Sequence, residues 1–395
     1  MECPLENIKV LDLSRVLAGP YATMILGDLG ADIIKVELPN TGDDARQFGP
    51  HVNNESAYFM SINRNKRSIT LNLKEHEGKK IFLELISQVD VLVENFRPGT
   101  MEKLNLGYKE LKEVNPKLIY AATSGFGHSG PYSKRAAYDA VVQAMGGIMS
   151  ITGEKGGKPT RVGSSIGDLT AGMFTVIGIL TALHSRSITG KGQKVDVAML
   201  DCQVSLLENA IARYAVTGEV PKPGGNRHPS IVPFESFDTL DGEIMIAAGN
   251  DALWKKLCLI LERETLVDDD RFKTNPLRNS NYEALRPLIS EAFKLKTTAE
   301  WQLLLDNGGI PNGPINTIDQ VLENPQVQAR EMVIEVEHPV AGKLKMPGIP
   351  IKLSDTPGKV RRPAPILGQH TEEILKELLQ YSNEKLKRLK DKNIF

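Results

Sequence analysis

The sequence predicts an α/β protein with a mostly parallel sheet, on three observations. Over the first half of the chain, short apolar runs alternate with segments of helical periodicity, as in repeated β–α units. The first of these units ends its second strand in an acidic residue. Residues 218–233, with four prolines and three glycines, then indicate a linker, beyond which short strands mix with several helices.

The first βαβ unit opens the chain. We expect a strand at Ile8–Leu13, a helix at Tyr21–Leu29 that starts near Gly19-Pro20, and a strand at Asp32–Glu37. This is the topology of a dinucleotide-binding domain. The turn SRVLAGP lacks the GxGxxG pattern that lets a pyrophosphate approach the backbone, so a nicotinamide cofactor is not expected.

The alternation continues toward residue 216. Strands are expected at Ser68–Leu73, Val89–Phe96, Leu118–Ser124 and Lys194–Met199, and helices at Glu77–Ile86, from about Tyr108, and at Asp201–Val216. The loops ENFRPG and GFGHSGP follow two of these strands, at the edge where parallel sheets bind ligands, although each is also ordinary turn chemistry.

Basic side chains gather in the same part of the chain. They are Arg64, Lys66, Arg67, Lys74, Arg97, Lys103 and Arg135. Such residues are either solvated on the surface or placed to hold a polyphosphate, and their spacing does not choose between the two.

Beyond the linker, the elements change in kind. A strand is expected at Glu243–Ala248, helices at Ala252–Arg263, Tyr282–Leu295 and Thr298–Leu305, short strands within residues 331–352, and a helix from Thr371. The basic end KLKRLKDKNIF is expected to be a solvated, fraying tail.

A long apolar helix, Ser164–Arg186, is expected at the centre of the chain. Its buried face is predicted from apolar residues at steps of three and four. These are Leu169, Met173, Val176, Leu180 and Leu183.

Asp168 lies in the first turn of this helix, where free N–H groups and the helix dipole favour a charged carboxylate. It is either a capping residue that contributes about 1 kcal/mol or a nucleophile that needs no general base because it is ionised. In the second case, Gly163 and Gly167 let a bulky substrate come close.

Composition excludes several classes of protein. Forty-eight basic and 49 acidic residues leave a net charge of −1, so neither nucleic acid nor a membrane is an expected partner. No apolar run approaches the ~20 residues of a membrane span. The three cysteines are widely spaced, which indicates a reducing compartment and no metal site. Because the N-terminus enters a strand almost at once, we expect a cytoplasmic protein, or a mitochondrial matrix protein if a transit peptide has been removed.

Nine motifs, in order from Ile8 to Leu378, resemble those of class III (CaiB/BaiF) CoA-transferases, a family that also contains acyl-CoA racemases. They are VLDLSRVLAGPYATMILGDLGADIIKVE, NRNKRSITLNLK, VENFRPGTMEKLNLGY, GFGHSGPYSKRAAYDAVVQAMGG, GDLTAGMFTVIGILTAL, TGKGQKVDVAMLD, NRHPSIVPF, GPINTIDQVLENPQV and LGQHTEEIL. Within the family, the chain is most similar to the succinate–hydroxymethylglutarate type.

The resemblance implies that Asp168, which matches the aspartate of the family motif GDLxxG, is the nucleophile and not a capping residue. Its carboxylate attacks an acyl-CoA thioester to give a mixed anhydride and CoA thiolate, which then forms an aspartyl-CoA thioester. The acceptor carboxylate takes the CoA through the reverse pair of steps. Coenzyme A is thus a substrate, and neither a permanently bound cofactor nor a metal is expected.

The resemblance also implies contacts with CoA. The expected contacts are Val16, Ala18, Leu71, Lys74, Asn95, Phe96, Lys103 and Met199, with the two lysines facing phosphates and Phe96 facing adenine or pantetheine. The formyl-CoA branch has a basic residue, a glutamine and a lysine where this chain has Leu38, Leu17 and Ala136. Arg135 is the expected substitute for the lysine. Leu17, beside the substrate, argues against formyl-CoA:oxalate specificity.

Tyr138 separates the two activities of the family. Racemases have a histidine at this position to shuttle the α-proton, whereas tyrosine, with a reference pKa of about 10, is a poor base at neutral pH. A transferase is therefore favoured over a 2-methylacyl-CoA racemase, with Tyr138 and Asp139 shaping the acceptor site. A third alternative is a non-catalytic acyl-CoA-binding protein, against which the intact Asp168 argues.

The resemblance suggests succinyl-CoA as donor and a dicarboxylate such as glutarate or hydroxymethylglutarate as acceptor. Arg64 and Arg15 are candidates to pair with the distal carboxylate, and each is also a plausible structural residue. His228, on the linker, is expected to be structural or to gate the site.

The resemblance further implies an interlocked homodimer, in which each chain threads the other through its linkers. The expected organisation is a Rossmann-like large domain (residues 1–217 and 363–395), a linker (218–233), a smaller α+β domain (234–330) and a return segment of short strands (331–362).

Overall fold

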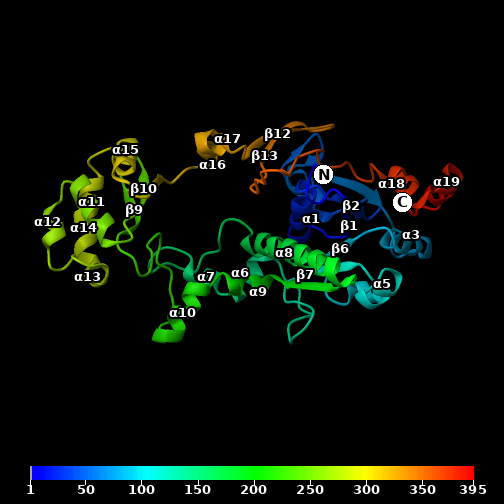
Figure 1. The fold of residues 1–395 in the computed structure, drawn as a ribbon, viewed down its shortest axis with the longest axis horizontal. Helices are drawn as coiled ribbons and strands as arrows, with labels where there is room; N and C mark the ends of the chain where they lie inside the picture. Colours follow the sequence, from blue (N-terminus) through cyan, green and yellow to red (C-terminus); the bar gives the residue numbers. More distant parts are fainter. Residues whose placement is uncertain (1) are drawn as a thin grey trace. The chain divides into compact units, whose positions relative to one another are not determined.

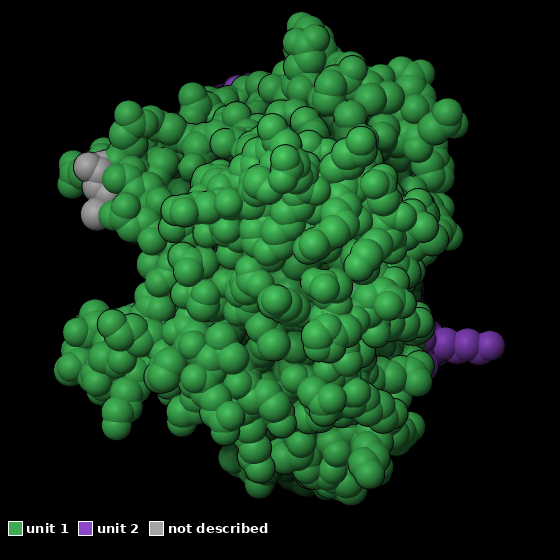
Figure 2. Space-filling model, turned by 90° about the vertical axis from the view of Figure 1, so that its right-hand side faces the viewer, with its two compact units in different colours: residues 1–149, 161–219, 328–395 green, residues 150–160, 220–327 purple. Residues whose placement is uncertain are grey.

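The structure, a computed structural model, describes residues 2–395 and divides into two compact units. Among the described residues, unit 1 comprises residues 2–149, 161–219 and 328–395, and unit 2 comprises residues 150–160 and 220–327 (green and purple in Figure 2; Figure 1 labels their helices and strands). Each unit contains a hydrophobic core of its own.

A six-stranded parallel sheet forms the centre of unit 1, as the sequence predicts. Its strands are β1 (Lys9–Asp12), β2 (Asp32–Glu37), β5 (Lys66–Thr70), β6 (Val91–Glu94), β7 (Ile119–Ser124) and β8 (Lys194–Ala198). All neighbours are parallel, and the order β5–β2–β1–β6–β7–β8 is that of a doubly wound sheet. The order reverses between β1 and β6, whose carboxyl ends are the expected place for a ligand.

Helices cover both faces of this sheet (Figure 1). On one face lie α1 (Ala18–Asp28) and α8 (Ile166–Thr189), and on the other lie α3 (His76–Ile86), α5 (Tyr108–Val114), α18 (Thr371–Leu379) and α19 (Asn383–Asp391). Alternate residues of a strand point to opposite faces, so Val10 packs toward α1 and α8 while Leu11 packs toward α3.

Shorter elements complete unit 1. They are the 3-10 helix η1 (Asp44–Gln47), the hairpin of β3 (His51–Val52) and β4 (Glu55–Ser56), α2 (Ala57–Ile62), α4 (Thr100–Lys103), α6 (Asp139–Met145), α9 (Met199–Ser205), α10 (Glu208–Thr217) and the hairpin of β12 (Val333–His338) and β13 (Gly342–Pro347). The single helix expected at residues 201–216 is thus two helices, which meet at Leu206 and Leu207. Another short helix, α7 (Ile148–Ile151), begins in unit 1 and ends in unit 2, because the division between the units falls after residue 149.

The buried face of α8 matches the predicted one only in part, with Val176 buried and Leu169, Leu180 and Leu183 half-buried. Ala171, Thr175 and Ala182 are buried, whereas Met173 is 42% exposed. The cause is close helix packing, because a Cβ on Gly172 would lie 2.8 Å from the carbonyl oxygen of Ala18 on α1. Among the described residues, α8 alone is long and apolar enough to cross a membrane, a test that core helices also pass.

Unit 2 combines a small antiparallel sheet with helices. The strands β9 (Phe234–Asp238), β10 (Glu243–Ala247) and β11 (Asn312–Pro314) pair in the order β11–β10–β9. The helices are α11 (Asp251–Ile260), α12 (Thr265–Asp268), α13 (Asn275–Ser280), α14 (Tyr282–Phe293), α15 (Thr298–Gly308), α16 (Ile318–Glu323) and α17 (Pro325–Ala329), the last of which leads back to unit 1. Trp254 and Trp301 lie in the core of unit 2.

Residues 150–160 belong to unit 2, although the sequence placed them inside the large domain. The carbonyl of Gly153 accepts a hydrogen bond from the Gly225 N–H (2.9 Å), and Lys155 pairs with Glu283 (2.7 Å). These contacts join segments far apart in the sequence, so local pattern alone does not reveal them.

The basic C-terminal segment is ordered, contrary to the expectation of a fraying tail. Leu386 and Leu389 of α19 and Ile394 are buried in the core of unit 1. The Ile394 carbonyl also accepts a hydrogen bond from the Asn72 N–H (2.9 Å). Leucines three residues apart give α19 an apolar face, which the surrounding lysines obscure in the sequence.

Candidate active site

Two cavities in unit 1 open where the strand order reverses. The Asp168 cavity, about 380 Å³, is lined by residues 15–18 after β1, residues 95–98 after β6, residues 135–138, Asp168 and further residues of unit 1. The Lys74 cavity, about 420 Å³, lies between the loops that follow β1, β2, β5 and β6. Both cavities are lined by Arg15, Phe96 and Thr100, so together they form one elongated site.

The structure brings most of the predicted site residues together here. The Asp168 cavity contains Arg15, Val16, Leu17, Ala18, Asn95, Phe96, Arg135, Tyr138, Asp168 and Met199, and the Lys74 cavity adds Leu71, Lys74 and Lys103. The Asp168 carboxyl group thus lines one part of the site, and the exposed lysines Lys74 and Lys103 line the other. This arrangement suits an elongated ligand with a reactive group at one end and phosphates at the other.

Asp168 lies in the first turn of α8, but the N-cap position belongs to Ser165. Burial raises the pKa of Asp168 to about 7, and the nearby charge of Asp139 adds to the effect. Burial and the like charge of Asp139 thus oppose the helix dipole, which the sequence analysis expected to favour the charged carboxylate.

The Asp139 side chain is hydrogen-bonded to the first turn of α8. Its Oδ1 accepts a hydrogen bond from the Gly167 N–H (2.8 Å), and its Oδ2 accepts one from Gln143 Nε2 (2.8 Å). A Cβ on Gly167 would lie 3.0 Å from Asp139 Oδ1, so this glycine serves helix packing and not substrate access. Asp139 is buried and does not line the cavity, so it acts on Asp168 through charge and position.

The loop between β1 and α1 is strained. Val16 has a φ of 66°, a left-handed conformation that is rare for a β-branched residue. Its N–H donates to Asp43 Oδ1 (3.0 Å), while the N–H and C=O of Arg15 bond to the side-chain amide of Asn95 (2.8 and 2.7 Å). Asp43 follows β2 and Asn95 follows β6, so residues from the neighbouring strand ends hold the loop in place.

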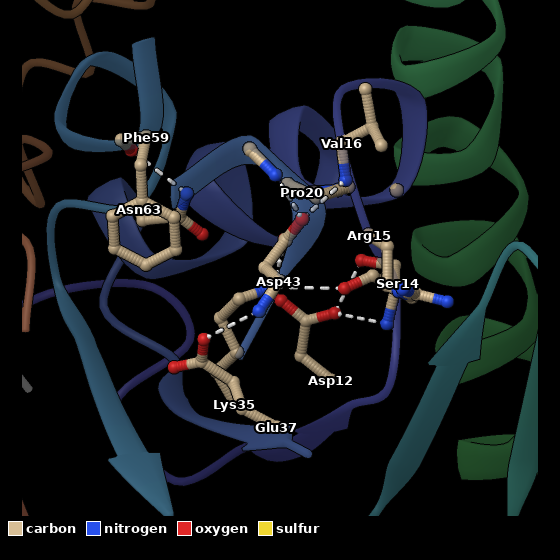
Figure 3. Close-up of polar contacts among 12 residues, drawn as sticks. Asp12, Ser14, Arg15, Val16, Pro20, Lys35, Glu37, Asp43, Phe59 and Asn63 are labelled. Carbon is tan, nitrogen blue, oxygen red and sulfur yellow. Dashed lines mark hydrogen bonds and ion pairs between the residues drawn. The ribbon is translucent and has the colours of Figure 1, made fainter. Parts of the chain in front are cut away.

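Buried charges stabilise this loop from inside the sheet. Lys35 on β2 pairs with Asp43 (2.9 Å) and donates to the Ser14 carbonyl (2.8 Å) (Figure 3). Beside it, Lys66 pairs with Asp12 (3.1 Å). Lys66 therefore belongs to the interior and not to a polyphosphate site.

Arg64 also lies away from both cavities. Its side chain is buried, and its guanidinium donates to both carboxylate oxygens of Asp28 (3.0 and 2.7 Å) and to the carbonyl of Pro347. The expectation that Arg64 grips a substrate carboxylate is therefore corrected, because its donors are used inside the fold. The third cation of this segment, Arg67, is likewise buried in an ion pair with Asp32 (2.6 Å).

Tyr138 and Arg135 lie at the entrance of the Asp168 cavity. The Tyr138 side chain is 78% exposed. The Arg135 guanidinium lies over the ring of Tyr132, 4.7 Å from its centroid, and lines the same cavity. Both residues are thus available to a ligand, as the sequence suggested.

Three residues near the site were not predicted. Asp43 and Asp44 follow the carboxyl end of β2, a position that the parallel-sheet rule would have flagged. The third is Tyr58 on α2, whose pKa is raised to about 12 by burial and by the charges of Asp168 and Asp43. Its closeness to Asp168 depends on tertiary contacts, so the sequence offered no signal for it.

His228 belongs to unit 2, outside the two cavities of unit 1. Its ring stacks on Phe234, with centroids 5.2 Å apart, and its Nδ1 accepts hydrogen bonds from the N–H groups of Ser230 and Ile231 (both 3.1 Å). These contacts hold the turn that leads into β9. Across residues 2–395, no group of three or more His, Cys, Asp or Glu side chains could hold a metal ion.

Known proteins resemble this chain over nearly its full length. The model of CoA-transferase family III matches residues 5–371. A succinyl-CoA:glutarate CoA-transferase from Homo sapiens is 44% identical over 381 residues, which cover 96% of this chain and 87% of that protein. An acetyl-CoA:oxalate CoA-transferase from Acetobacter aceti is 43% identical, with 95% of each chain covered. The crystal structure of a CaiB/BaiF family protein from Brucella suis has a TM-score of 0.85 and 41% identity, covering 96% of this chain and 100% of that chain.

The doubly wound sheet, with a carboxyl group in a cavity at its switch point, defines the class of this protein, an α/β fold of the kind that binds ligands at the carboxyl ends of its strands. With the family match, the identification becomes specific: the chain belongs to CoA-transferase family III. The predicted family and enzyme class are confirmed.

Proposed function

We propose that this chain transfers CoA from succinyl-CoA to a dicarboxylic acid such as glutarate or hydroxymethylglutarate. The observation that carries the proposal is the Asp168 cavity, where the carboxyl group of Asp168 and the arginines Arg15, Arg97 and Arg135 line a single space, together with Asp44. The carboxylate is a nucleophile for a thioester, and arginine is the best partner for a second carboxylate. Two relatives are named for the dicarboxylates glutarate and oxalate, which supports the class of acceptor.

In the proposed mechanism, ionised Asp168 attacks the thioester carbonyl, a C–O bond forms, and the C–S bond breaks to release CoA thiolate. The thiolate attacks the aspartyl carbonyl of the resulting anhydride, which frees succinate and leaves an aspartyl-CoA thioester. The acceptor carboxylate then attacks this thioester, and the returning thiolate takes the acceptor's acyl group, so Asp168 is restored. No net proton is consumed, because each step exchanges one anion for another.

The Lys74 cavity is the proposed place for the rest of CoA. Lys74 and Lys103 are exposed cations that can each pair with a phosphate as a point charge. Phe96 lines both cavities and offers a ring for adenine or pantetheine to lie against. The exposed apolar Leu38 takes the place of the basic residue of the formyl-CoA branch, so the two lysines carry the phosphate contacts.

The test is a panel of acyl-CoA donors and carboxylic acid acceptors read by mass spectrometry. We expect exchange between succinyl-CoA and glutarate or hydroxymethylglutarate, and an adduct of succinyl or CoA on the peptide that carries Asp168. The variant Asp168→Ala should bind CoA and show no transfer. Substantial turnover by that variant would contradict the mechanism, and a preference for acetate would contradict the dicarboxylate assignment.

We also propose a homodimer, as the family resemblance suggests. The outer face of α8 carries Met173, Phe174 and Ile177, which are 42%, 40% and 57% exposed. An apolar stripe on a central helix is typical of a covered surface. Sedimentation should show a dimer at micromolar concentration, and a stable monomer would contradict this assembly.

A further inference from the structure

Arg15 occupies the junction of the two cavities. It lines both of them, whereas Arg97 and Arg135 line the Asp168 cavity alone. Arg15 is also the only one of the three with a carboxylate partner among the described residues: its Nη2 lies 2.7 Å from Asp44 Oδ1. Asp44 lines the Asp168 cavity as well, so this ion pair lies within the substrate site.

The two backbones that carry this pair are fixed. The N–H and C=O of Arg15 are both bonded to Asn95, as described above. Asp44 follows Asp43, whose buried carboxylate accepts the N–H groups of Val16 (3.0 Å) and Ala45 (2.9 Å) (Figure 3 labels Asp43 and Val16). The side chains of Arg15 and Asp44 are therefore the parts that can move.

The ion pair itself is exchangeable. The side chains of Arg15 and Asp44 are 43% and 53% exposed, and exposed pairs of this kind contribute little to stability. Arg15 is the only described side chain that pairs with Asp44. A carboxylate of a ligand can replace Asp44 as the partner of the Arg15 guanidinium. The Asp44 carboxylate is then hydrated by solvent, at a small cost in free energy.

We propose that Asp44 is the internal competitor for Arg15, and that the distal carboxylate of a dicarboxylate substrate displaces it. This inference rests on the proposed function and names Asp44 as the residue that limits the preference for dicarboxylates which Arg15 provides. When the acceptor has one carboxylate, Arg15 stays paired with Asp44 and its charge stays neutralised. When the acceptor has two, the second takes over the guanidinium, so Asp44 weakens the binding of dicarboxylates alone.

The experiment compares glutarate with pentanoate, which has the same chain length and one carboxylate. In Asp44→Asn, the ratio of kcat/KM for glutarate to that for pentanoate should rise about two- to fivefold, the factor that corresponds to an exposed ion pair. The change should lie in KM, because the pair does not contact the reacting carboxyl. Asp44→Glu keeps the competing charge and should stay close to the wild-type ratio, whereas Arg15→Met should abolish the preference for glutarate.

The outcomes separate this inference from the proposed function. If Arg15→Met loses the preference and Asp44→Asn leaves the ratio unchanged or lowers it, Asp44 is not a competitor and the inference is overturned, while the dicarboxylate assignment stands. If the wild type has no preference for glutarate over pentanoate, the proposed function fails with it. A rise in the ratio that also appears in Asp44→Glu would show a steric effect and would overturn the inference.

Discussion

The substitution Asp168→Asn should stabilise the folded protein at alkaline pH. The raised pKa means that the folded state holds a proton on Asp168 at a pH where the unfolded chain has lost it. The free energy of unfolding therefore falls as pH rises from about 4 to about 7 and is constant above that. An asparagine does not ionise, so the variant escapes this loss.

The size of the gain follows from the structure. Moving a carboxyl pKa from 3.8 to about 7 destabilises the charged form by up to roughly 4 kcal/mol, at about 1.4 kcal/mol per tenfold change in ionisation constant. Asp168 keeps partial contact with solvent, which screens the effect, so we expect a gain of about 1–2 kcal/mol at pH 8. Toward pH 4 the difference should disappear.

Urea denaturation at pH 5, 6, 7 and 8, followed by circular dichroism, measures this difference. Tryptophan fluorescence is unsuitable, since both tryptophans, Trp254 and Trp301, lie in unit 2. Asp201→Asn is the matched control, because Asp201 also lies in the first turn of a helix, α9, but is exposed. A gain at pH 8 that is equal at pH 5, or a destabilised Asp168→Asn variant at pH 8, would refute the reasoning.

Three further predictions follow from the same contacts. In Asp139→Asn, the pH at which transfer is half-maximal should fall by about one unit, because the substitution removes the like charge beside Asp168. Gln143→Leu is the control and should leave this pH unchanged. An unchanged pH profile in Asp139→Asn would contradict the prediction. Arg64→Met should lower the free energy of unfolding by roughly 3–5 kcal/mol, because it leaves the buried Asp28 carboxylate without its ion-pair partner. Adding Asp28→Asn to this variant should recover much of the loss. If urea denaturation finds the single variant as stable as the wild type, the Arg64–Asp28 pair is not a structural one. In deuterated water, a 2-methylacyl-CoA should show no enzyme-dependent α-exchange, since Tyr138 replaces the histidine of the racemases; rapid exchange by mass spectrometry would support a racemase.

The sequence predicted most of the parallel sheet because β1, β6 and β7 are buried along nearly all of their length and consist mainly of apolar residues. The polar strand β5 was located less well and begins two residues before the predicted Ser68. For β2, the predicted bounds and the observed bounds are the same, Asp32–Glu37. For α8 the same reasoning was only partly right: Val176 is buried as predicted, but small residues such as Ala171 share the buried face and Met173 faces outward. Hydrophobicity indicates burial only when packing distance leaves room for large side chains.

The sequence could locate those parts of the site that are loops at strand ends, because such loops have recognisable local motifs. The loops after β1 and β6, and Asp168 itself, were located in this way. The partners of charged side chains were not, because they come from distant segments: Arg64 and Asp28 are both polar and unremarkable in the sequence, yet they form a buried pair. The pKa of Asp168 likewise depends on burial and on Asp139, which the sequence alone does not place beside it.

The strained conformation of Val16 has a consequence for how this enzyme can be altered. Stabilising design favours glycine wherever φ is positive, and position 16 would be an obvious choice. Glycine, however, would remove a side chain that lines the Asp168 cavity and would loosen the loop that carries Arg15. Improvements in thermal stability at this position should therefore come at the expense of substrate recognition, which makes the β1–α1 loop a poor target for stabilisation and a good one for changing specificity.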